Sequence, residues 1–362
     1  MFLALREFRH SKLRYALITA VIVMVSSLVF ILSGLANGLS AGNSEALESI
    51  GGDGIVVSSG SEYQLDRSAI AADHAETIAG IDGIEEAEPF GASAINVKRD
   101  GSDDVLGISI LGMPAGGFLD PGASEGEALG ATENGIVVDE SMINEGISVG
   151  DILVTDPGGV ELEVIGVTDG YQYRLVPTAI VPIEIWQELQ QDPERGVSAI
   201  VVNGEQEAID SIPDEVERTM VATSSELIDN LPGQTEQQAT LTLIQVFLVV
   251  IAAGIIAAFF FIITLQKMPE LGVMKAIGTK SGYLARTLLL QVGILGVIGI
   301  VIGIAFSWVT DMLIGGAVPF ALEWQSMAMY GGILLVVGMI GTLLSLFRIA
   351  RVDPLDAINN AG

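Results

Sequence analysis

The chain has 362 residues with a formal net charge of −29, half of its residues are hydrophobic, and its mean hydropathy is +0.56. The lack of cysteine excludes disulfides and thiolate chemistry, and the acidic balance gives no reason to expect nucleic acid as a partner. Because the apolar residues gather in four runs of membrane-spanning length, a soluble enzyme is a poor description of this chain.

The chain begins with a basic segment, residues 1–14, followed by an apolar run that predicts a transmembrane helix over 15–37. Phe2, Leu5 and Phe8 fall on one side of the basic segment, as in an amphipathic helix lying along the membrane surface. A plain extension of the first span is the alternative. A secretory signal peptide is the alternative for the apolar run, but the run is long for that purpose.

The long segment 38–240 has the pattern of an α+β domain that ends in a polar stalk. Short β-type runs bounded by glycine, proline and acidic residues alternate with stretches typical of helices. The predicted strands cover 54–57, 134–138, 151–154, 164–167, 179–181 and 199–202, and the predicted helices cover 68–79, 140–145, 183–190 and 205–212. A segment of about 200 residues can bury a hydrophobic core.

Three further spans are predicted toward the C-terminus. They cover 241–266, 284–309 and 327–347, joined by a cytoplasmic segment 267–283 and an outer loop 310–326, and followed by a tail 348–362. The expected fold is therefore a membrane α-helical protein with four transmembrane helices and an α+β extracellular domain inserted between the first and the second.

The distribution of charge predicts the orientation. Ten of the 16 basic residues lie before the first span, in or beside the segment 267–283, or after the last span, whereas residues 38–240 carry six basic and 39 acidic residues. The positive-inside rule then places both termini in the cytoplasm and residues 38–240 outside the plasma membrane. The acidic excess fits a hydrated surface that repels anions, and equally a salt-rich habitat.

The segment 267–283 predicts a short polar helix on the cytoplasmic side. Glu270 in the opening turn complements the helix dipole. Met274 and Ile277 recur at helical spacing on an apolar stripe, and Gly278 fits the left-handed cap that ends a helix. A helix in this place offers a surface on which a soluble partner can act.

Residues 270–278, Glu-Leu-Gly-Val-Met-Lys-Ala-Ile-Gly, follow the pattern E-x-G-x-x-(K/R)-A-x-G of the loop between the second and third spans in MacB/FtsX-like ABC transporter permeases. The chain resembles this family also in its one-plus-three order of spans. Further resemblance lies in residues 135–140, 147–151 and 177–186 of the external segment and in 351–354 near the C-terminus. Together these similarities cover nearly the whole chain.

The resemblance implies a homodimeric permease in the membrane lipid, driven by a separate cytoplasmic ABC ATPase that binds ATP and magnesium. The segment 267–283 would lie in a groove of that ATPase. The residues implied in this coupling are Glu270, Leu271, Gly272, Met274, Lys275, Ala276 and Gly278. The chain lacks a P-loop of its own, because Gly272 and Gly278 stand one residue further apart than G-x-x-x-x-G-K-S requires.

Patterns for catalysis and metal binding are weak. The two histidines are His10 and His74, and Asp73 and Glu76 beside His74 are typical of a solvated helix surface. No serine lies in a G-x-S-x-G motif. We therefore expect no catalytic residue, no intrinsic metal and no intrinsic cofactor.

A substrate site is expected at the outer ends of the first two spans, which the family's dimer architecture brings together. The first span ends in small residues between 33 and 42, which suit close helix packing or a crevice open to the outer leaflet. Glu45 and Glu48 follow on one helical face, toward residues 234–245 of the next span. An apolar crevice with a few oxygen or thioether ligands suits a flat amphiphile taken from the membrane.

Within the family, the compact form resembles the HrtB-type haem exporters, so haem is the leading hypothesis for the substrate. The resemblance and the residue chemistry together nominate iron ligands among Met24, Glu45, Glu48 and a tyrosine of 171–174, with Arg174 as the partner of a propionate. The predicted substrate-binding residues are Met24, Asn37, Glu45, Glu48, Tyr171, Tyr173 and Arg174. The two tyrosines would equally serve as ordinary strand residues.

Two alternatives stay open. One is an exporter of peptide, antibiotic or lipid. The other is an FtsX-like transducer that carries no substrate and instead regulates a cell-wall enzyme.

Overall fold

The computed structural model describes residues 12–190, 196–267, 272–274, 277–279, 281–314 and 318–350. These form two compact units: Met1–Gly38 with Ala239–Gly362, and Leu39–Gln238. Most of the predicted segments 1–14 and 348–362 lies outside the described residues.

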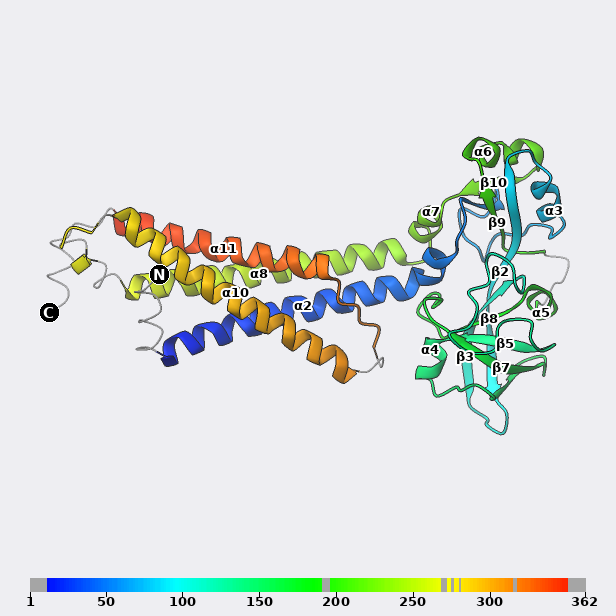
Figure 1. Cartoon of the computed structure of the whole chain (residues 1–362), viewed down its shortest axis with the longest axis horizontal. Coiled ribbons are helices and arrows are strands. Elements are labelled where there is room, and N and C mark those ends of the chain that lie inside the picture. The colour runs from blue at the N-terminus through cyan, green and yellow to red at the C-terminus, as the bar shows by residue number, and fades with distance from the viewer. Residues whose placement is uncertain are drawn as a thin grey trace. The chain divides into compact units, whose positions relative to one another are not determined.

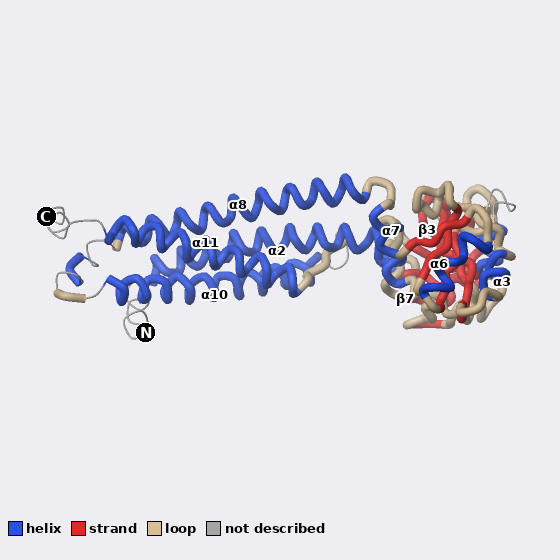
Figure 2. Tube along the Cα trace, turned by 90° about the horizontal axis from the view of Figure 1, so that it is seen from above, coloured by secondary structure: helices blue, strands red, loops and turns tan. Residues whose placement is uncertain are grey.

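The first unit is helical, and its helices lie side by side in both views (Figures 1 and 2). The helices are α2 (Lys12–Ser49), α8 (Gln234–Gln266), α10 (Ser281–Ile314) and α11 (Trp324–Ala350). Within the described residues, these four are long and apolar enough to cross a membrane, which confirms the predicted number of spans. Both α2 and α8 continue beyond their predicted spans into the second unit.

Glycines let these helices approach closely. A side chain at Gly299 or Gly303 of α10 would overlap Ile22 or Ser26 of α2, and one at Gly341 of α11 would overlap Ala257 of α8. Hydrocarbon tails are as apolar as leucine, so association in a membrane depends on this kind of close packing rather than on the hydrophobic effect.

The second unit contains a long mixed sheet with short helices on its faces (Figure 1). Its strands are β1 (Gly54–Ser58), β2 (Ile84–Arg99), β3 (Val105–Met113), β4 (Glu125–Gly126), β5 (Gly135–Asp139), β6 (Ile152–Thr155), β7 (Glu161–Thr168), β8 (Thr178–Pro182), β9 (Ala199–Gly204) and β10 (Thr219–Ala222). Its helices are α3 (His74–Ala79), α4 (Glu140–Asn144), α5 (Ile183–Glu188), α6 (Gln206–Glu215) and α7 (Ser224–Asp229). The strand order is β10-β1-β9-β2-β3-β8-β5-β7-β4, and β6 pairs with β2 and β7.

Strand β2 joins the two halves of the sheet. Its first part, up to Phe90, pairs with β9, and its second part, from Gly91, pairs with β3. Because one continuous strand belongs to both ladders, the two halves share a backbone connection as well as side-chain packing.

The sheet buries side chains on both faces. Successive residues of a strand point to opposite faces, and accordingly Val56 and Ile110 belong to one hydrophobic cluster, while Ile55 and Leu111 belong to another. The first cluster is covered by side chains of α3, α5 and α6. The second is covered by α7 and by the end of α2, where Ala46 and Leu47 of the helix and Ile50 directly after it are buried.

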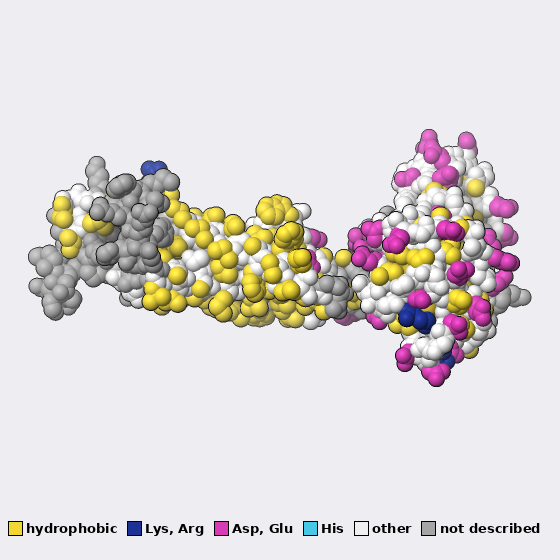
Figure 3. Space-filling view, turned by 60° about the horizontal axis from the view of Figure 1, so that its bottom comes forward, with side chains coloured by type: hydrophobic (Ala, Val, Ile, Leu, Met, Phe, Trp, Pro, Cys, Tyr) yellow, Lys and Arg dark blue, Asp and Glu magenta, His cyan; other side chains and the backbone are white. Residues whose placement is uncertain are grey.

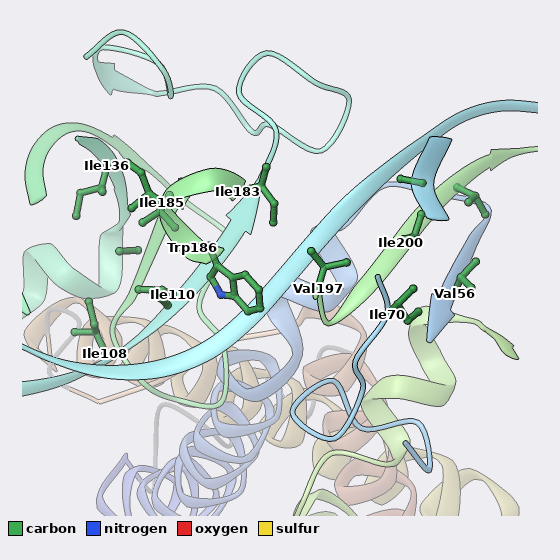
Figure 4. Packing of buried hydrophobic residues seen from close by; sticks show 14 of the residues in the cluster. Val56, Ile70, Ile108, Ile110, Ile136, Ile183, Ile185, Trp186, Val197 and Ile200 are labelled. Atoms are coloured by element: carbon green, nitrogen blue, oxygen red, sulfur yellow. The ribbon is translucent and has the colours of Figure 1, made fainter. Parts of the chain in front are cut away.

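Trp186 of α5 lies over a cross-strand pair of glycines (Figure 4). Gly91 of β2 and Gly112 of β3 are directly opposite each other, and a side chain on either would overlap the indole. The two glycines therefore leave room for the largest side chain in the first cluster.

The structure confirms the predicted strands near 54, 135, 152, 164, 179 and 199. The predicted helix 68–79 was wrong in its first half, because the backbone of Ile70 pairs with Val197 through two hydrogen bonds of 2.9 and 2.7 Å and only His74–Ala79 is helical. The sequence interpretation missed the strands β2, β3, β4 and β10 and the helix α7.

The second unit, Leu39–Gln238, is called the outer unit from here on. We expect Gly112→Ala to lower its free energy of unfolding by about 1–3 kcal/mol, the usual effect of overpacking, because the methyl group overlaps Trp186. Gly107→Ala in the same strand is the control, since its added carbon would meet only Asn96 at 3.6 Å. Thermal unfolding of the full chain in detergent measures both. Equal melting temperatures for the two variants would show that the packing of the Trp186 indole does not require a glycine at position 112.

Candidate functional site

The end of α2 is bound by a loop of the outer unit. We call residues 42–49 of α2 together with loop 170–175 the α2 junction. The Leu175 amide donates to the Gly42 carbonyl at 2.8 Å, the Arg174 amide donates to the Asn43 carbonyl at 3.2 Å, and the Ala46 amide donates to the Gln172 carbonyl at 3.1 Å. Three backbone hydrogen bonds therefore join the end of this helix to the loop.

The loop holds this geometry through a tight turn. Arg174 and Leu175 have φ of 59° and 57°, and the Val176 amide donates to the Tyr173 carbonyl at 3.2 Å. Two consecutive left-handed residues define a type I′ turn, which glycine and asparagine usually occupy. A backbone conformation that costs of order 1 kcal/mol or more per residue persists where its surroundings enforce it, and here the turn directs two amides at α2.

Gly42 allows the loop to approach. An added carbon there would meet Gln172 Oε1 and Leu175 Cδ2, both at 2.7 Å. The small residues at 34 and 38 have a packing role as well, but against a different element. A side chain at Gly34 would meet the Phe320 ring at 2.7 Å, and one at Gly38 would overlap the backbone of Pro319.

Four of the predicted substrate residues meet at the α2 junction. Glu45 is half-buried, and the carboxylates of Asp139, Glu48 and Asp169 act on it electrostatically. Glu48 is exposed and accepts a hydrogen bond from Ser44 Oγ at 2.8 Å. Tyr171 donates its hydroxyl to the Ser49 carbonyl at 3.4 Å, and Arg174 contributes its backbone amide as described above.

The residue that contacts the start of α8 is Asn43 rather than either glutamate. Its side-chain amide donates to Gln234 Oε1 at 3.0 Å and to Gln237 Oε1 at 3.3 Å. Gln234 is buried. This amide pairing joins the outer ends of α2 and α8 and was not predicted, although the glutamines themselves were noted as a stalk.

Met24 and Asn37 lie at other levels of the helical unit. Met24 is 73% exposed and shares an apolar face of α2 with Leu17 and Leu28. At about 1.5 Å per residue, Met24 stands about 30 Å along the helix from Glu45, so the two side chains of one chain are too far apart to bind one iron. Asn37 donates to Ser326 Oγ at 3.4 Å.

Tyr173 is a core residue in a loop, not a strand residue. It is 5% exposed within the second hydrophobic cluster, and burial raises the pKa of its phenol to about 12. Burial also raises the pKa of Tyr171. Because a metal ligand must be deprotonated, the shift makes ionisation of Tyr173 cost roughly 3 kcal/mol more than for a free tyrosine, which disfavours it as an iron ligand.

Arg174 lies at the edge of a cavity of about 550 Å³, whose lining also includes Tyr173, Trp186 and Ser93. Its guanidinium is 3.6 Å from the Asp66 carboxylate. The two side chains are partly exposed, so this ion pair is weak, and Arg174 would have to leave Asp66 to bind another anion. Sequence reasoning missed this cavity, because its walls come from strands and loops far apart in the chain.

The segment 267–283 is described only in part. Glu270, Leu271, Lys275 and Ala276 lie outside the described residues, whereas Gly272 and Met274 fall in a short helical stretch. Gly278 has φ +98° and the Thr279 amide donates to the Met274 carbonyl at 3.1 Å, which confirms the predicted left-handed cap. Ile277 is 80% exposed and Val273 is also exposed.

Comparison with known proteins bears on the whole chain. The MacB-like periplasmic core domain matches residues 15–262 and the FtsX-like permease C-terminal domain matches residues 242–354. The chain belongs to the MacB/FtsX-like permease family. It is therefore an ABC transporter permease, and membership implies an ATPase partner.

Curated relatives match over their full length. The chain is 26% identical to a putative hemin transport system permease protein HrtB of Staphylococcus haemolyticus and 25% identical to one of Staphylococcus epidermidis, in each case over 99% of both chains. It is 24% identical to an uncharacterized ABC transporter permease of Mycobacterium tuberculosis over 98% of both chains.

Among solved structures, the extracellular domain of the noncanonic ABC-type transporter YknZ from Gram-positive bacteria matches with a TM-score of 0.36 and 16% identity, covering 47% of this chain and 98% of that one. The periplasmic region of MacB from Actinobacillus actinomycetemcomitans matches with a TM-score of 0.38 and 14% identity, covering 51% and 96%.

Titration of the full chain with alkali tests the burial of Tyr173. We expect one phenol to ionise late, near pH 12. Since this pKa exceeds the value of about 10 in an unfolded chain, the contribution of Tyr173 to stability is complete below pH about 10 and is lost as the pH rises through about 12. Phenolate absorbance measures the step, and a late step that persists in Tyr173→Phe would contradict the assignment.

Proposed function

We propose that this chain is the permease subunit of an ABC-type efflux system that takes a hydrophobic or amphiphilic substrate, haem in the first instance, from the membrane. The observation that carries the proposal is the full-length similarity to permeases named for hemin transport. The helices expose a continuous apolar surface that a membrane-dissolved substrate can reach (Figure 3).

The α2 junction supports a carboxylate as the iron-side ligand. Glu45 and Glu48 stand at the outer end of a membrane-spanning helix. Burial, together with the nearby carboxylates of Asp139, Glu48 and Asp169, raises the pKa of Glu45, and a bound iron would favour its charged form. Met24 and Asn37, which lie at other levels of α2, would contact haem at other points along its path rather than while Glu45 binds the iron. Arg174 would pair a propionate after leaving Asp66.

Orientation and partners follow from charge and exposure. Residues 38–240 lie outside and both termini in the cytoplasm under this proposal, in keeping with the acidic side chains over the outer unit (Figure 3). The ATPase, which supplies the ATP and magnesium sites, would bind the segment 267–283, where the exposed apolar side chains Val273 and Ile277 favour a protein groove over water.

A second copy of the chain would complete the transporter. Helix α8 is the least covered of the four spans, since 17% of its most apolar window is buried against 39% in α2. Between residues 243 and 262 its exposed residues are apolar or glycine, with Val246, Phe247 and Val250 among them. We propose that the homodimer contact uses part of this face and that lipid covers the rest.

An FtsX-like transducer remains the second candidate function. It is favoured by the burial of Ala46, Leu47 and Ile50 in the core of the outer unit, because a displacement of α2 would then deform that unit directly. Export of peptide, antibiotic or lipid has no comparable support in the described residues.

Haem titration into the purified full chain tests the substrate. We expect a shift of the Soret band with wild type and binding weaker by about tenfold or more in Glu45→Ala with Glu48→Ala, equivalent to ~1.4 kcal/mol, because the iron loses its carboxylate. Glu76→Ala, an exposed carboxylate on α3, is the control. Unchanged affinity in the double variant would contradict the assignment of these glutamates as iron ligands. The absence of a Soret shift with wild type would contradict haem as the substrate.

Gly278→Ala tests the coupling segment. A side chain at φ +98° costs of order 1 kcal/mol, so we expect severalfold weaker nucleotide-driven turnover in the complex with the ATPase. Gly282→Ala is a matched control, since neither glycine has an atom within 4 Å of an added carbon and only Gly278 has a positive φ. Equal turnover in the two variants would show that the cap does not matter for coupling.

A further inference from the structure

Lys267 is a buried cation at the inner end of the helical unit. It follows the last residue of α8 and is 5% exposed. Its ammonium donates to Tyr15 Oη of α2 at 3.0 Å and to Gln291 Oε1 of α10 at 3.1 Å, and it lies 5.6 Å from the centroid of the Tyr15 ring. We call these three side chains the inner polar cluster.

Burying a charged side chain at this position costs desolvation free energy. Charged side chains within membrane-spanning helices are rare and usually mark functional sites, and a lysine on this side could have extended to the headgroups instead. Tyr15 and Gln291 are buried as well, at 7% and 4% exposure. The two hydrogen bonds offset the desolvation of the ammonium.

The inner polar cluster joins three helices at one point. Lys267 is the first residue of the segment 267–283, so a displacement of that segment acts directly on it. Through Tyr15 it acts on α2, which is a single helix from Lys12 to Ser49, and the far end of α2 forms the α2 junction. Helix α11 packs closely against Ile256 and Phe260 of α8 at Gly338 and against Ala257 at Gly341.

We propose that Lys267 is a positioning residue for energy coupling: it fixes the inner end of α2 to the cytoplasmic segment, so that movement imposed by the ATPase reaches the α2 junction. The inference rests on the proposed coupling function and is independent of the identity of the substrate. Lysine supplies the donors and the positive charge, while Tyr15 and Gln291 supply acceptors on two other helices.

Hydrogen–deuterium exchange of the full chain in lipid nanodiscs, co-purified with its ATPase, tests the proposal. The Ala46, Arg174 and Leu175 amides of the α2 junction are bonded between helix and loop, so their exchange reports on that junction. In wild type we expect nucleotide to change exchange both in residues 267–283 and at the α2 junction. In Lys267→Met the change at the junction is lost while that in 267–283 remains, and Lys267→Arg retains both.

Arg286→Met is the matched control, because it removes an exposed cation on the same side of the unit and should behave as wild type. Co-purification of the ATPase shows that each variant assembles. If Lys267→Met fails to assemble, Tyr15→Phe, which keeps the ring but removes the hydroxyl, should still weaken the response at the junction.

The possible results are distinguishable. A full response at the α2 junction in Lys267→Met, or in Tyr15→Phe where the first variant does not assemble, overturns the role of Lys267. A wild-type chain that shows no nucleotide response at the junction overturns the proposed coupling itself, whatever haem titration shows.

Discussion

The structure depends on the burial of the last turns of α2 in the core of the outer unit. Leu47 and Ile50 are at 1% and 5% exposure, and full burial of such side chains stabilises a fold by about 1.5–3 kcal/mol each. Three backbone hydrogen bonds to loop 170–175 add direction to this apolar contact. The helix is therefore a structural part of the domain that follows it, and the loop's strained turn is explained by the bonds that it makes.

The same helix is also bound at its other end, and there the interactions are polar. Ammonium, phenol and amide groups hold the inner ends of α2, α8 and α10, whereas between the two ends glycines and small side chains set the helix contacts. Polar bonds thus fix this helix at its two ends, and close packing fixes it between them.

The sequence was informative where one residue or one run determines the structure. Long apolar runs predicted the spans, and Gly278 predicted a left-handed cap because few other residues adopt that conformation. Strand β2 was missed because Pro89 and three glutamates interrupt its pattern. The proline is tolerated because β2 has a ladder partner on only one side there. The α2 junction could not be predicted, since it joins residues more than a hundred positions apart through backbone atoms.

The loop between α10 and α11 has a consequence for how a substrate enters. Phe320 lies against Gly34, and the Ala321 amide donates to the Gly34 carbonyl at 2.9 Å. Under the proposed function, a flat molecule that approaches Gly34 from the outer leaflet would first meet the Phe320 ring. Selectivity would then depend on competition with the Phe320 ring. A molecule would bind beside Gly34 only if its own contacts replaced those of the ring, which small or weakly bound lipids would not do.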